Sequence, residues 1–145
     1  MGGSLLLAQN ADERVKANLD KLNYKYELKV DGIFQFMVPV NERYQLIFVN
    51  SATSMYDQME FREIYTIIYD SPQRPTEAIL GRLLIDNSKK KLGAWEMIVE
   101  EDKFYLIFTA KVPASLSAAD MKSTIDIVAF SADAMEMAIY NDDNW

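Results

Sequence analysis

The sequence predicts an α+β protein in which an antiparallel β-meander sheet carries three helices. Three segments place apolar residues at helical spacing, whereas the segments between them alternate apolar and polar residues, as half-buried strands do. Short turns join consecutive strands, which favours antiparallel pairing. The predicted order of elements is α-β-β-β-β-α-β-β-α, in one domain over residues 12–140 between an N-terminal extension (1–11) and an acidic tail (141–145).

Composition excludes several function classes. The 145 residues include 15 basic and 22 acidic side chains, a net charge of −7, and neither Cys nor His. Disulfides, thiolate metal sites and triads that need an imidazole are therefore excluded. The acidic balance argues against nucleic-acid binding. Because the apolar run at residues 5–8 is too short for a signal peptide or a membrane span, we expect a cytoplasmic protein without membrane contact.

The first helix is predicted over residues 12–22, with Asn10 and Glu13 as a capping box. The strands that follow are predicted over residues 24–30, 33–38 and 44–48, with turns at Asp31-Gly32 and at residues 39–43. In the second and third strands we assign to the core the side chains of Phe34, Phe36, Val38, Tyr44, Leu46 and Phe48.

Residues 50–60 are interpreted as a polar loop, followed by a strand over residues 61–69. The second helix is predicted over residues 75–86, with Asn87 as its stop. A hairpin of residues 95–100 and 103–112 turns at Glu101-Asp102. Ser117 is expected to cap the last helix, which runs to about residue 140.

The last helix is apolar on two nearly opposite sides. One stripe consists of Met121, Ile125, Val128, Ala132, Met135 and Ile139, and the other of Ile127, Phe130, Ala134 and Met137. A helix that lies on a sheet needs only one apolar stripe. The strands show the same excess, because a second set of apolar residues points away from the face assigned to the core: Ile33, Met37, Ile47, Val49, Ile98, Tyr105 and Ile107.

Two explanations for these second apolar faces stay open. The first two helices could cover them within the monomer, or a second copy of the chain or another protein could do so. The candidate interface comprises Ile127, Phe130, Ala134, Met137, Ile33, Met37, Ile47 and Ile107.

No pattern in the sequence indicates catalysis. A nucleophile elbow, a phosphate-binding loop and a dinucleotide fingerprint are all missing. The acidic residues that could act together, Asp57 with Glu60 and the run 100–102, are interpreted as solvated turns. We therefore expect no catalytic residue, no metal ion and no cofactor.

Three motifs resemble the YbjN-domain family. They are Leu83-Leu84-Ile85-Asp86-Asn87, then Lys91-Leu92-Gly93-Ala94-Trp95-Glu96, then the run from Phe104 to Pro113. The resemblance covers roughly residues 12–140 and is most specific over 83–120. It implies a fold similar to that of type III secretion chaperones, which are small acidic homodimers that bind extended segments of client proteins. It implies no catalytic residue, and it implies architectural roles for Asn87, Gly93 and Trp95.

The leading hypothesis is a non-enzymatic homodimeric module that binds protein or peptide clients in a chaperone-like or regulatory role. A second hypothesis is a small-molecule-binding protein or enzyme that uses a tyrosine-rich sheet, formed by Tyr24, Tyr26, Tyr44, Tyr65, Tyr69 and Tyr105. A third is a structural subunit of a larger assembly.

Overall fold

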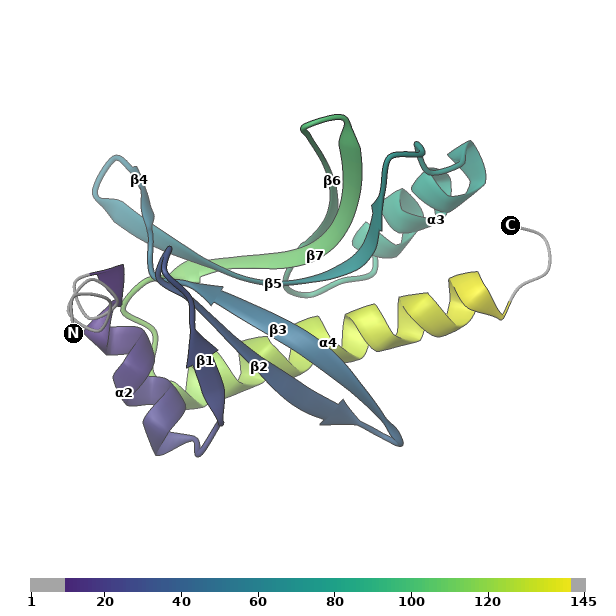
Figure 1. The fold of residues 1–145 in the computed structure, drawn as a ribbon. Helices are drawn as coiled ribbons and strands as arrows, with labels where there is room; N and C mark the ends of the chain where they lie inside the picture. The colour runs from purple at the N-terminus through teal and green to yellow at the C-terminus, as the bar shows by residue number, and fades with distance from the viewer. Residues whose placement is uncertain (1–9, 142–145) are drawn as a thin grey trace.

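A seven-stranded antiparallel sheet with helices on one side forms the fold, which confirms the α+β class (Figure 1). The structure is a computed structural model that describes residues 10–141. The helices are α2 (Glu13–Lys21), α3 (Glu77–Asn87) and α4 (Ala118–Tyr140). The strands are β1 (Tyr26–Leu28), β2 (Ile33–Val40), β3 (Arg43–Asn50), β4 (Ser54–Tyr56), β5 (Met59–Ser71), β6 (Ala94–Glu100) and β7 (Lys103–Pro113).

The sheet follows the order β1-β2-β3-β5-β7-β6, and β4 pairs with the start of β5. Helix α4 crosses β2, β3, β5 and β7, while α2 lies against α4 and α3 against β6. All three helices therefore lie on the same side of the sheet. A register shift between Ile67 and Tyr69 in β5 marks a bulge, and the β6–β7 hairpin curves away from the rest of the sheet beyond it.

The core lies between α4 and the sheet. The first stripe of α4, from Met121 to Ile139, is buried as predicted, and it packs in one cluster with strand residues such as Phe34, Ile64 and Phe108. Ser117 caps α4 by accepting a hydrogen bond from the Asp120 backbone N–H, also as predicted.

The three motif residues have the architectural roles that the resemblance implied. The Asn87 side chain accepts a 2.6 Å hydrogen bond from the backbone N–H of Trp95. The Trp95 ring meets Phe108 edge-on, with ring centres 5.1 Å apart. Gly93 has a φ of +87°, and a Cβ there would lie 2.7 Å from the Phe108 ring, so this position requires glycine.

The predicted facing of β3 is wrong. The sequence predicts a turn over residues 39–43, but Pro39 and Val40 continue β2 and only two residues form the turn. In this register Phe36 lies opposite Ile47, and Phe34 lies opposite Val49. Directly opposed residues share a face of a sheet.

The core consequently receives Ile47 and Val49, which are fully buried. The residues assigned to the core in their place, Tyr44, Leu46 and Phe48, point to the opposite face.

Three further boundaries differ from the predictions. The supposed loop at residues 50–60 contains β4 and the start of β5, paired through Ser54 and Phe61. Helix α3 starts after an N-cap at Thr76 rather than at Pro75. Helix α2 is capped by Asp12, which accepts from the Arg14 backbone N–H, and not by Asn10.

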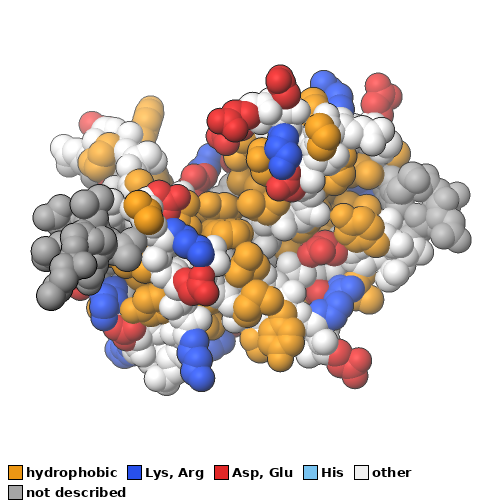
Figure 2. Space-filling view, in the orientation of Figure 1, with side chains coloured by type: hydrophobic (Ala, Val, Ile, Leu, Met, Phe, Trp, Pro, Cys, Tyr) orange, Lys and Arg blue, Asp and Glu red, His pale blue; other side chains and the backbone are white. Residues whose placement is uncertain are grey.

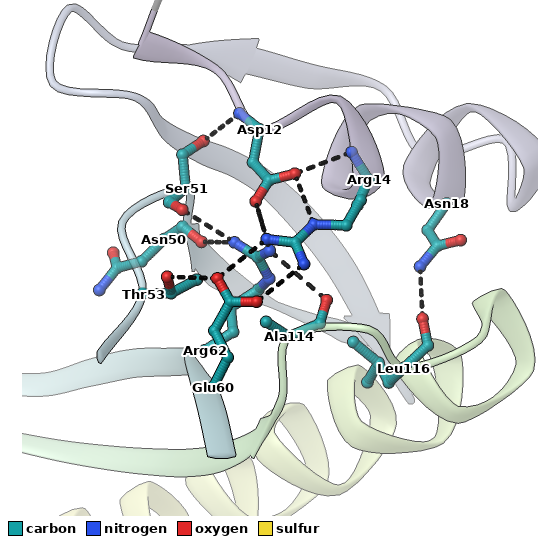
Figure 3. A network of polar contacts seen from close by, with 10 residues as sticks. All are labelled: Asp12, Arg14, Asn18, Asn50, Ser51, Thr53, Glu60, Arg62, Ala114 and Leu116. Atoms are coloured by element: carbon teal, nitrogen blue, oxygen red, sulfur yellow. Dashed lines mark hydrogen bonds and ion pairs between the residues drawn. The ribbon is translucent and has the colours of Figure 1, made fainter. Parts of the chain in front are cut away.

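A buried arginine joins four segments of the chain at one end of the sheet (Figure 3). The Arg62 side chain in β5 is fully buried and pairs with the Asp12 carboxylate at 2.6 Å. It also donates to the backbone carbonyls of Asn50 at 2.7 Å, Ser51 at 3.0 Å and Ala114 at 3.5 Å. These contacts link β5 to three other segments, which are the start of α2, the end of β3, and the connection between β7 and α4.

A second arginine extends this network to the surface. Arg14 contacts Asp12 at 2.8 Å and Glu60 at 2.9 Å, and Glu60 also accepts a hydrogen bond from the Thr53 hydroxyl. Hydrogen bonds from Arg14, and then from Thr53, lower the pKa of Glu60 to about 2. The pKa of Asp12 is held well below its usual range by hydrogen bonds from Arg14 and Arg62, against the opposing effect of burial.

The Asp12 contacts predict a specific loss of stability in acid. Because the pKa of Asp12 is lower in the folded chain than in the unfolded chain, its contribution is fully present above the ordinary value of about 4 and is lost as the pH falls below it. We expect Asp12→Asn to lower the free energy of unfolding by about 3 kcal/mol at pH 7, because Arg62 would then be buried without a charged partner.

Urea unfolding between pH 7 and pH 2 measures this effect. The decline of stability below pH 4 should be shallower in Asp12→Asn than in the parent protein. Asp57→Asn, at the exposed turn between β4 and β5, is the control and should follow the parent curve. Equal acid slopes in Asp12→Asn and the parent would contradict the role assigned to Asp12.

Candidate functional site

The face of the sheet opposite the helices is uncovered and rich in apolar side chains, with polar residues such as Gln35, Glu63 and Glu96 among them. We call it the open face, and it is formed by Ile33, Met37, Leu46, Phe48, Tyr65, Ile67, Ile98, Tyr105 and Ile107. Met37 is 53% exposed, Ile67 38% and Leu46 37%. Figure 2 shows this side of the molecule, where hydrophobic side chains gather across the centre of the view.

A cavity of about 380 Å³ lies in the open face where β5, β6 and β7 meet. Ile67 and Ile107 are cross-strand partners in it, and Ile107 is buried. Phe48 stacks on Tyr65 at its border, with ring centres 5.1 Å apart and an angle of 19° between the rings. The cavity is lined by Asn50, Glu63, Tyr65, Ile67, Ile98, Glu100, Tyr105 and Ile107.

The electrostatic environment of this cavity is acidic. Its lining includes two carboxylates and no Lys or Arg. Burial raises the pKa of Tyr65, and the negative charges of Asp31, Glu63 and Glu100 raise it further. These three acids lie on different parts of the chain, and the fold brings them near the Tyr65 ring.

A second apolar surface lies on the outer side of α4. We call it the α4 outer stripe, and it consists of the four predicted residues Ile127, Phe130, Ala134 and Met137. Phe130 is 52% exposed, Met137 is 45% exposed, Ala134 is exposed and Ile127 is half-buried. A groove between α3 and α4 borders the stripe, and Ala134 lines it together with Ile85 of α3.

The structure divides the predicted interface into three parts. Ile33, Met37 and Ile107 belong to the open face, and the four helix residues belong to the α4 outer stripe on the other side of the molecule. Ile47 is a correction, because it is fully buried in the core and cannot contact a partner. One alternative was that the first two helices cover the second apolar face of the sheet. This alternative is wrong, because α2 and α3 lie on the opposite face of the sheet.

The acidic residues considered for catalysis occupy turns and ion pairs. Glu101 and Asp102 have φ values of +48° and +64° and form the β6–β7 turn, while Asp57 has a φ of +52° in the β4–β5 turn. Glu60 belongs to the Arg62 network. Within residues 10–141, no three acidic side chains are close enough together to hold a metal ion.

Three features of the cavity were not predicted from the sequence. They are the presence of Glu63, the presence of Glu100, and the stacking of Phe48 on Tyr65. Phe48 was missed because the register of β3 was misjudged. The two acids come from different strands, Glu63 from β5 and Glu100 from the end of β6, so no local sequence pattern brings them together. No helix between residues 10 and 141 combines the length and apolar character that crossing a membrane requires.

The acidic environment predicts the titration of Tyr65. We expect its hydroxyl to ionise above the ordinary tyrosine pKa of about 10. Glu100→Gln should lower that pKa, because it removes a nearby negative charge, whereas Glu77→Gln on α3 should leave it unchanged. NMR titration of the labelled tyrosine ring carbon measures the value. A Tyr65 that titrates like free tyrosine in the parent protein would contradict the described surroundings.

Comparison with known proteins identifies the fold. No protein-family model matches the chain, and no curated protein matches it significantly. The chain is similar to the crystal structure of YbjN from E. coli, a proposed transcription regulator, with a TM-score of 0.55 and 10% sequence identity. The match covers 89% of this chain and 90% of YbjN. The chain therefore has a YbjN-like fold.

Proposed function

We propose that the chain is a non-enzymatic protein-binding module with a chaperone-like or regulatory role. It forms a homodimer through the α4 outer stripe and binds an extended segment of another protein on the open face. The observation that carries this proposal is the presence of two uncovered apolar surfaces on opposite sides of one small molecule. Contiguous apolar patches on soluble proteins commonly mark interaction sites.

The α4 outer stripe suits contact with a second copy of the chain. It is a single line of side chains along a straight helix, so the same stripe on a partner can pack against it about a two-fold axis. Ala134 has a small side chain between Phe130 and Met137, and small residues let two helices approach closely. Burial of these side chains contributes about 25 cal/mol per Å² of apolar surface.

The open face suits a segment in extended conformation. It is broad and lies across several strands, and the curved β6–β7 hairpin bounds it at one end. Met37 can adapt to different neighbours because its side chain is flexible, while Phe48, Tyr65 and Tyr105 provide rigid rings. A surface of this kind accommodates alternate side chains of an extended peptide. The proposed regulatory role of YbjN is compatible with such binding.

Two variants separate the two surfaces. We expect Phe130→Asp to be a monomer that still binds a nine-residue, dye-labelled peptide in which leucine alternates with serine. Ile67→Asp should remain a dimer and lose that peptide, because a charged carboxylate would replace an isoleucine that the leucine side chains of the peptide contact. Light scattering over a dilution series measures the mass, and fluorescence anisotropy measures peptide binding.

Leu84→Asp is the matched control, because Leu84 is apolar and 70% exposed but lies on α3, outside both surfaces and outside the lining of the groove between α3 and α4. It should behave as the parent protein in both measurements. A parent protein that is monomeric at all concentrations would contradict the dimer. A peptide that binds neither the parent nor Phe130→Asp would contradict the client-binding role.

A further inference from the structure

We infer that the open face selects protein segments in which a Lys or Arg side chain is flanked, two positions away on each side, by apolar residues. The basic side chain enters the cavity around Tyr65, and its apolar neighbours contact the surrounding surface. This inference rests on the proposed function, because it specifies the chemistry of the client that the open face binds.

The charge of the cavity is the first argument. Glu63 and Glu100 contribute carboxylates to its lining, and no cationic side chain lines it. The pKa of Tyr65 responds to both of them and to Asp31, so their negative potential reaches the ring. A partner that places a positive charge there gains a favourable Coulomb interaction, which a partner with an acidic or neutral side chain does not.

The neighbouring lysines leave this negative charge largely uncompensated. Lys111 lies 3.1 Å from Glu96 and 3.9 Å from Glu63, so it pairs mainly with Glu96. Lys103 pairs with Asp70 at 2.8 Å at the edge of the face. Among the ion pairs of residues 10–141, none includes Glu100.

The aromatic rings give the second argument. Tyr65 and Tyr105 both line the cavity, and the faces of tyrosine rings attract ammonium and guanidinium groups. The Lys103 ammonium lies 5.8 Å from the centre of the Tyr105 ring, within the range of a cation–π contact. The long aliphatic part of a Lys or Arg side chain can meanwhile pack on the isoleucines Ile67, Ile98 and Ile107.

The spacing of the segment follows from strand geometry. In an extended peptide, side chains at positions i−2, i and i+2 point to the same side and are roughly 6.5–7 Å apart. When the basic residue at position i enters the cavity, an apolar neighbour can contact Phe48, the cross-strand partner of Tyr65, and Leu46, which lies on the same face of β3.

A single-position peptide series tests this inference. The parent peptide is the nine-residue leucine–serine peptide used above, and its central leucine is replaced by arginine or by glutamate. We expect the arginine peptide to bind about tenfold more tightly than the glutamate peptide at low salt, a difference that a charge-assisted contact supplies. The preference should shrink as salt screens the interaction.

The decisive comparison uses two double variants with the same net charge. Glu63→Gln with Glu100→Gln should abolish the preference for the arginine peptide over the glutamate peptide. Glu42→Gln with Glu77→Gln, on an exposed turn and on α3, should keep the preference. Loss of the preference in both double variants would overturn the inference, because net charge rather than the cavity would then explain it.

The possible failures are distinguishable. If the parent peptide binds but arginine and glutamate peptides bind equally, the inference is wrong and the proposed function stands. If none of the three peptides binds, the proposed client-binding function itself is wrong.

Discussion

Arg62 is a buried positive charge that one carboxylate and three backbone carbonyls compensate together. Burial of an unpaired charge costs several kcal/mol, so the segments that supply these partners must be in place when the guanidinium is buried. The constraint fixes the start of α2 and the connection from β7 to α4 against the sheet. It also reaches the open face, because Asn50, whose carbonyl accepts from Arg62, lines the cavity around Tyr65.

The two-residue turn between β2 and β3 decides which side chains form the core. It places Phe36 opposite Ile47, so Ile47 and Val49 face the helices while Leu46 and Phe48 are left on the other side. The strands are apolar on both faces of the sheet, but the helices cover only one of these faces. The other face remains exposed as the open face. The same reasoning applies to α4, whose first stripe is buried against the sheet and whose outer stripe remains exposed.

Local patterns in the sequence were sufficient to predict the fold class, the order of the main elements and the two stripes of α4. Hydrophobic periodicity and capping depend on residues that are close in sequence, such as Ser117 and Asp120. The register of β3 could not be predicted in this way, because a one-residue shift in the pairing register moves every side chain of the strand to the opposite face. The acidic cavity could not be predicted either, since Asp31, Glu63 and Glu100 meet only through the long-range pairing of the strands. Arg62 appears in the sequence as an ordinary charged residue in a strand, and only the fold shows that it is buried.

Site-specific photocrosslinking distinguishes the occupants proposed for the two apolar surfaces. A photoreactive amino acid is placed at Met37 on the open face or at Ala134 on the α4 outer stripe, and the purified protein is irradiated with the arginine peptide. We expect a peptide adduct from position 37 and a crosslinked dimer from position 134. Peptide adducts from position 134, or dimers formed through position 37, would contradict these assignments.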